Sequence, residues 1–223
     1  MAIPAPRDLK IGKIIDKTLA VLELNAVPAL IFVVALTAAT LPITYASVGS
    51  LDPLKIAGGQ LLGSVVGVVC GYFLLVAMIR RTGLQSRTEG DVFLPYVGML
   101  ILSGIAVTLG FFVIILPGLF LMARWMIAGP LMVARGGGVM ATLGESWNRT
   151  RGNELAIIAA ALALVLIPVA VLIAARVFFE EGNLAGMVVS QIGSSAISAI
   201  LGAMSVALYG LIVGGASEAA AFE

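Results

Sequence analysis

Arg124 is the residue whose setting in the sequence most suggests a chemical role. It lies inside the apolar segment 118–134, where a charge is costly and is by default a functional candidate. A guanidinium group fits phosphate oxygens in a bidentate geometry, so Arg124 is a candidate to bind a lipid phosphate or another ligand, with Trp125 and Trp147 as candidates beside it. The alternative is a side chain that extends to the membrane surface or bonds helix-end carbonyls.

The other reactive residues are too few for most catalytic or metal sites. The chain has no His and one Cys, which excludes a histidine-based triad, a zinc site and a disulfide within one chain. Its acidic residues fall singly in predicted loops, which argues against both a metal-dependent hydrolase and a proton-coupled carrier, and no acid is expected beside Arg124. We therefore predict that the protein is not an enzyme and has no cofactor and no metal.

Composition indicates a membrane protein. Of 223 residues, 61% are hydrophobic and 11% are charged, whereas about a quarter of the residues in a soluble domain are charged. A helix that crosses a hydrocarbon core about 30 Å thick takes roughly 20 residues. Six segments are long or apolar enough, and they lie near residues 26–48, 54–79, 93–115, 118–134, 155–178 and 186–214. The sequence therefore predicts one all-α integral membrane domain, 1–223, with six transmembrane helices in three hairpins and a sharp turn at residues 116–118.

The basic residues predict an orientation, because short loops rich in Lys and Arg stay on the cytoplasmic side. Ten of them fall on one side of the predicted spans: Arg7, Lys10, Lys13, Lys17, Arg80, Arg81, Arg87, Arg135, Arg149 and Arg151. Only Lys55 and Arg176 fall on the other side. Both termini are therefore expected in the cytoplasm.

Two segments on this basic side have the pattern of amphipathic helices. Residues 8–24 carry Lys10, Lys13 and Lys17 opposite an apolar side: Ile11, Ile14, Ile15, Leu19 and Leu22. Such a helix either lies in the membrane interface, with its lysines toward anionic headgroups, or packs on the protein's own spans. In residues 138–152 a second apolar face is formed by Val139, Met140, Leu143 and Trp147.

Small residues form regular stripes in two of the predicted spans. Each stripe repeats every four residues: Gly59, Gly63, Gly67 and Gly71 in the second span, and Ser190, Ser194, Ser198 and Gly202 in the sixth. Stripes of this kind usually allow two helices to pack closely, and internal packing is the leading interpretation. The alternatives are a homo-oligomer contact and a groove that admits a lipid tail.

The stretch from the fourth span to the fifth resembles a known family. The resemblance rests on Pro117, Gly118, Arg124, Pro130, Leu143, Ser146, Trp147, Thr150, Arg151 and Gly152, together with the opening helix DLKIGKIIDKTLAVLELN. This pattern is similar to that of the YciC-like bacterial inner-membrane proteins and of the membrane domain attached to some glycerophosphodiester phosphodiesterases. The resemblance implies a multi-pass protein of the bacterial cytoplasmic membrane. The motif contains no catalytic residue and the chain shows no phosphodiesterase domain, so that activity is not expected.

The leading functional hypothesis is a non-enzymatic membrane protein that interacts with lipid or with a membrane partner in envelope homeostasis, assembly or lipid handling. Its expected partners are membrane lipids, with a second copy of the chain or another membrane protein as alternatives, and no nucleic acid. A small permease or channel is the second hypothesis, and it predicts a continuous polar cavity. A membrane-embedded lipid enzyme is the third, and it lacks the residues named above.

Overall fold

The computed structural model describes residues 9–85, 91–113, 115–180 and 182–213, and these residues form helices without any strand. The helices are α1 Ile11–Leu24, α2 Ala26–Ser47, α3 Pro53–Arg81, α4 Phe93–Val113, α5 Ile115–Trp125, α6 Ala128–Arg135, α7 Val139–Arg149, α8 Glu154–Phe178 and α9 Leu184–Ile212. The predicted all-α class is confirmed for this part of the chain.

Six helical stretches are long and apolar enough to cross a membrane. They are Ala26–Ser47, Pro53–Arg81, Phe93–Phe112, Ile115–Arg135, Glu154–Phe178 and Leu184–Ile212. The predicted number of spans is confirmed, and each stretch lies close to its predicted range. The chain is therefore a multi-pass α-helical membrane protein.

The sequence predicts one unbroken helix for the fourth span, whereas the structure interrupts this stretch. α5 ends at Trp125 and α6 begins at Ala128, so the stretch is interrupted at residues 126–127. Pro130 explains the interruption, because proline has no N–H to donate and its ring clashes with the carbonyl of the residue four positions earlier.

The junction between α4 and α5 also precedes the predicted turn at 116–118, since α5 already begins at Ile115 and Pro117 lies in its first turn. Proline is tolerated there because first-turn N–H groups have no partner within the helix.

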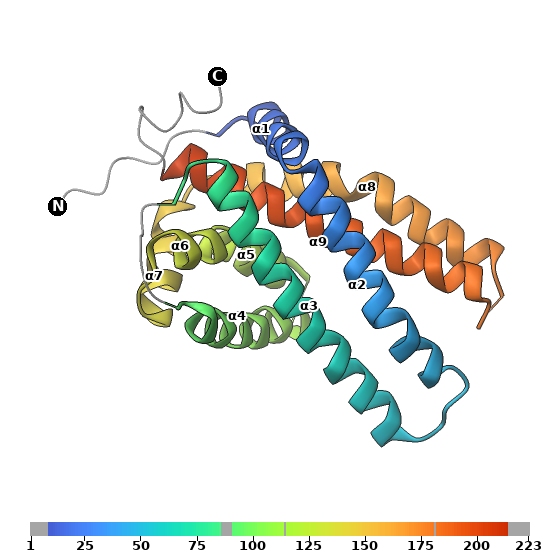
Figure 1. Ribbon diagram of the computed structural model, residues 1–223. Helices are drawn as coiled ribbons and strands as arrows, with labels where there is room; N and C mark the ends of the chain where they lie inside the picture. The colour runs from blue at the N-terminus through green and yellow to red at the C-terminus, as the bar shows by residue number, and fades with distance from the viewer. Residues whose placement is uncertain (1–8, 86–90, 114, 181, 214–223) are drawn as a thin grey trace.

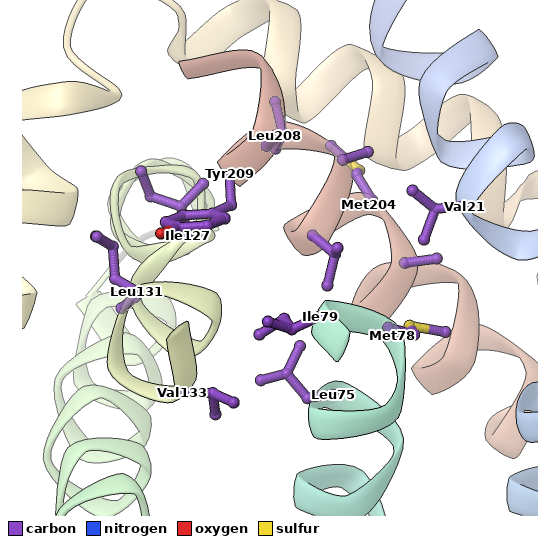
Figure 2. Close-up of a cluster of buried hydrophobic side chains, with 14 of the residues drawn as sticks. Val21, Leu75, Met78, Ile79, Ile127, Leu131, Val133, Met204, Leu208 and Tyr209 are labelled. Atoms are coloured by element: carbon purple, nitrogen blue, oxygen red, sulfur yellow. The ribbon is translucent and has the colours of Figure 1, made fainter. Parts of the chain in front are cut away.

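The buried core lies toward one end of the molecule, which we call the packed end. It joins α1, the C-terminal turns of α3 and α9, α6 and the beginning of α8. Figure 2 shows side chains of α1, α3, α6 and α9 converging, together with Ile127 just before α6: Val21, Leu75, Met78, Ile79, Ile127, Leu131, Val133, Met204, Leu208 and Tyr209. An unbroken run of α9, residues 203–210, is buried.

The opposite half of the molecule is much less covered, and we call it the open half. In Figure 1 the pair α2 and α3 and the pair α8 and α9 diverge as they leave the region of α1, α6 and α7. Large apolar side chains are exposed toward the far ends of these pairs, such as Leu54 at 83% and Phe178 at 82%. Exposure of this kind suits helices that are covered by lipid rather than by water.

α1 packs through a face that overlaps only in part with the apolar side that the sequence pattern indicated. Ile14, Thr18 and Val21 are fully buried, and α1 contacts α8 and α9. Ile11 and Leu19, predicted on the same apolar side as Ile14, are exposed. The alternative prediction, a helix packed on the protein's own spans, describes these contacts.

α7 also divides its predicted apolar face. Leu143 is buried, whereas Met140 is 73% exposed, and Val139 and Trp147 are half-buried. Thr142 and Ser146 take part in the buried side instead. The helix is therefore anchored by hydroxyl side chains that the apolar pattern did not include.

Candidate functional site

Arg124 lies at the packed end, where α5, α7 and α8 meet. Its Nη1 donates a hydrogen bond to the carbonyl of Trp147 at 2.9 Å, and its Nη2 lies 2.8 Å from Glu154 Oε1. The Arg124 side chain is 8% exposed and that of Glu154 is 17% exposed. The expectation that no acid accompanies Arg124 is therefore wrong, because the first residue of α8 supplies its counter-charge.

The main chain of Arg124 is held as firmly as its side chain. Its carbonyl accepts hydrogen bonds from Ser146 Oγ at 2.8 Å and Thr150 Oγ1 at 3.0 Å. This carbonyl is at the C-terminal end of α5, where carbonyls have no partner within the helix. Two hydroxyls of the α7 region therefore cap α5.

Aromatic rings enclose the guanidinium group. The Arg124 Cζ atom lies 5.0 Å from the centre of the Phe120 ring and 4.8 Å from that of Trp147, within the range of cation–π attraction. Trp125, the other predicted neighbour, has its ring centre 6.1 Å from that of Trp147. The structure thus places Trp125 and Trp147 near one another beside Arg124, and their role as ligand-binding residues stays a prediction.

This arrangement works as a connection between helices. Both terminal nitrogens of Arg124 already have partners, and only its buried Nε has none among the described residues. The carboxylate of Glu154 already neutralises the guanidinium charge, which lowers the attraction of this site for a phosphate. The contacts correspond to the alternative in which Arg124 bonds helix-end carbonyls.

The glycine stripe of α3 has a different environment from the predicted one. At Gly63, Gly67 and Gly71, an added methyl group would meet no described atom of another residue within 4 Å. Only at Gly59 would it lie close to another helix, 2.9 Å from Ser47 Oγ of α2. Internal close packing is therefore wrong for most of this stripe within one chain.

Other glycines provide the close helix contacts. A methyl group added to Gly118 of α5 would lie 2.5 Å from Phe111 Cγ of α4, and one added to Gly193 of α9 would lie 2.8 Å from Leu172 Cδ2 of α8. These positions do not repeat at a regular spacing along either helix, so the sequence pattern does not indicate them.

The two small-residue stripes instead line an open groove between α2, α3 and α9. Its central cavity has a volume of about 370 Å³. Polar side chains on all three helices line it: Thr40, Thr44, Ser47, Gln60, Ser64, Gln191, Ser194, Ser195 and Ser198. Gly59, Gly63 and Gly67 form part of the same wall, so the missing side chains of α3 create the space.

Two further cavities adjoin the central one because they share lining residues with it. A cavity of about 580 Å³ shares Ser64, Gly67 and Ser198, is mostly apolar, and reaches Trp125 and residues 128–130 at the interruption between α5 and α6. Gly71 and Gly202, the remaining small residues of the α3 and α9 stripes, lie along this apolar cavity. The other cavity, of about 510 Å³, shares Thr44, Gln191 and Ser194.

The third cavity forms the mouth of the groove. It includes Ser190, the first residue of the α9 stripe, and it ends at the connection between α8 and α9, where Arg176 and Glu180 line it. The groove thus runs from a charged mouth through a polar middle to an apolar interior.

The hydroxyl groups along the groove are arranged mainly as acceptors. Thr40, Ser64 and Ser198 each donate to a carbonyl four residues earlier in their own helix. The Gln191 amide links α9 to α2, since its Nε2 donates to Thr40 Oγ1 at 2.7 Å. The remaining oxygen lone pairs can accept hydrogen bonds from a ligand or from water.

Sequence reasoning missed several of these residues. No role is predicted from the sequence for Glu154, Thr40 or Thr44. The four-residue spacing of the two threonines was the available signal, because it puts both hydroxyls on one face of α2.

The predicted lysines of α1 form no part of either site. Lys10 and Lys13 are exposed and Lys17 is half-buried.

Within the described residues no three His, Cys, Asp or Glu side chains gather in a way that could hold a metal ion. No protein-family model, curated protein or solved structure matches this chain.

Proposed function

We propose that this protein is a non-enzymatic multi-pass membrane protein that binds a membrane lipid in the groove between α2, α3 and α9. The observation that carries the proposal is the exposure of Ser194 and Ser198 to an open cavity in the middle of a membrane-length helix. Polar groups at this depth are costly when they face hydrocarbon. A bound polar headgroup or water gives their oxygen atoms partners.

The shape of the groove suits an amphiphilic ligand. Its polar middle of about 370 Å³ leads into a mostly apolar cavity of about 580 Å³, and both volumes lie in the usual range for small-molecule sites. A lipid has the same division, with a polar head joined to apolar chains. A water-soluble solute would leave the apolar cavity without a matching surface.

The placement in the cell is part of the proposal. The basic residues Lys10, Lys13, Arg80, Arg81 and Arg135 lie on or beside helices of the packed end, which supports a cytoplasmic position for that end and for both termini. α1 then lies as an amphipathic helix at the cytoplasmic surface, with three helical hairpins behind it. The resemblance to the YciC-like family supports the bacterial inner membrane and a role in envelope homeostasis or lipid handling.

Lipid binding can be tested by a substitution that fills the groove with a larger side chain. We expect the purified protein in mild detergent to retain phospholipid that native mass spectrometry detects, and Gly67→Leu to lower that amount strongly, because Gly67 lines both the polar and the apolar cavity. Gly58→Leu is the matched control, since Gly58 lies on the same helix, is exposed and lines none of the three cavities. Equal lipid in both variants, or none in the unmodified protein, would contradict the proposal.

A small permease is the second candidate, and the adjoining of the three cavities favours it. It predicts that proteoliposomes containing the protein take up a neutral solute such as glycerol faster than empty liposomes do. Uptake that Gly67→Leu abolishes would favour the permease. Uptake equal to that of empty liposomes would contradict it.

A further inference from the structure

The mouth of the groove carries one charge of each sign. Arg176 lies in the last turn of α8, and Glu180 follows in the connection to α9. Both residues are exposed, and neither side chain forms an ion pair or hydrogen bond within the described part of the chain. Both groups are therefore available to a ligand that enters the mouth.

The interior of the groove is electrically neutral. None of the described residues that line the polar and apolar cavities is Lys, Arg, Asp or Glu. A ligand with a net charge would gain no compensating charge inside. The lining thus favours a ligand whose own charges sum to zero.

The polar atoms next to the mouth favour a hydrogen-bond donor. Thr44 lines the mouth and uses its hydroxyl proton on the Thr40 carbonyl, and its oxygen, which accepts from Gln191 Nε2 at 3.4 Å, keeps a further lone pair for a ligand. Asn183 also lines the mouth, but its side-chain oxygen already accepts from the Gly186 N–H and caps α9. An ammonium group is a strong donor and has no acceptor of its own.

From these observations we infer that the groove selects a zwitterionic phospholipid with a primary ammonium group, of the phosphatidylethanolamine class. The inference rests on the proposed function. Arg176 pairs with the lipid phosphate in a charge-assisted geometry, and Glu180 together with the hydroxyl oxygens accepts hydrogen bonds from the ammonium group. The acyl chains extend toward the apolar cavity lined by Leu74 and Met99.

Two other lipid classes fit this mouth less well. An anionic phosphatidylglycerol headgroup satisfies Arg176 but leaves Glu180 without a cation. A phosphatidylcholine headgroup supplies a cation whose methyl groups replace the N–H donors. The preference is expected to be modest, because exposed ion pairs are weak.

The test is a competition among lipids with identical acyl chains. The protein is equilibrated in mixed micelles that contain equal amounts of phosphatidylethanolamine, phosphatidylcholine and phosphatidylglycerol, and its retained lipids are counted by native mass spectrometry. We expect phosphatidylethanolamine to be enriched about two- to fivefold over the other two classes. Glu180→Gln should remove that enrichment and shift it toward phosphatidylglycerol, whereas Arg176→Gln should lower the retained amount of all three lipids, because each carries the phosphate that Arg176 binds.

Lys55→Gln is the matched control for Arg176→Gln. Lys55 is an exposed cation at the beginning of α3 that lines none of the three cavities, so its replacement should leave both the retained amount and the enrichment unchanged. Retention of the three lipids in their mixed proportions, or enrichment of phosphatidylglycerol by the unmodified protein, would overturn the inference while leaving lipid binding intact. Absence of any retained lipid would instead remove the proposed function.

Discussion

The packed end and the open half both contain small hydroxyl residues, but these residues have opposite roles in the two regions. At the packed end, Ser146 and Thr150 are buried and bond the carbonyl of Arg124, so their hydroxyls hold α7 against α5. In the open half, Ser194 and Ser198 face a cavity. The difference teaches that a hydroxyl on a helix either closes a contact or lines a space, depending on whether an unpaired carbonyl lies opposite it.

The largest expected effect tests whether Arg124 closes the packed end. Arg124→Ala leaves Glu154 without its counter-charge and the Trp147 carbonyl without its donor, which should lower the free energy of unfolding by about 3 to 5 kcal/mol. Thermal unfolding in detergent, followed by tryptophan fluorescence, measures the loss.

The control for Arg124 is a second arginine in an exposed ion pair. Arg135→Ala breaks the contact with Glu145. The side chains of Arg135 and Glu145 are 39% and 38% exposed, so this change should lower the free energy of unfolding by about 1 kcal/mol or less. Equal losses for Arg124→Ala and Arg135→Ala would erase the distinction between the packed end and an ordinary charged surface.

A core substitution comes next in expected size. Leu208→Ala removes a fully buried side chain of α9 and should cost about 3 kcal/mol through lost contacts and an unfilled cavity. The same change at Leu166 of α8, which is 66% exposed, should have little effect on the unfolding midpoint. Similar midpoints for the two variants would show that the packed end is no better packed than the lipid-facing surface.

Two glycine substitutions give the smallest effects and compare the helix contacts directly. Gly118→Ala forces Phe111 to move and should cost about 1 to 3 kcal/mol. Gly67→Ala adds the same methyl group to open space and should be neutral or stabilising by up to about 1 kcal/mol, because alanine favours helix. A comparable loss at Gly67 would show that another helix or a second copy of the chain occupies the groove in solution.

The sequence was sufficient for the membrane class and for the spans. Long apolar runs such as residues 155–178 leave few alternatives to a membrane helix, and caps such as Asp52, whose side chain accepts from the Leu54 N–H, mark where helices begin. These properties depend on residues that are close together along the chain. They can therefore be predicted without knowledge of the tertiary contacts.

The candidate sites depended on contacts that spacing along the chain does not contain. Glu154 reaches Arg124 because the chain turns between α7 and α8, and no local pattern shows the direction of that turn. Likewise, the regular spacing of Gly63 and Gly67 indicates a smooth surface on α3 but not whether another helix covers it. The spacing therefore identified residues that line the groove, but it predicted a packed helix where the structure has a cavity.

The ion pair between Arg124 and Glu154 also has a consequence for biosynthesis. A ribosome delivers α5 to the membrane before it has made α8, so Arg124 first enters without its carboxylate partner. An arginine costs at most about 2.5 to 3.5 kcal/mol on insertion scales, a value reached at the centre of a helix. We therefore expect the fourth span to be held in the bilayer more firmly once the fifth span supplies Glu154.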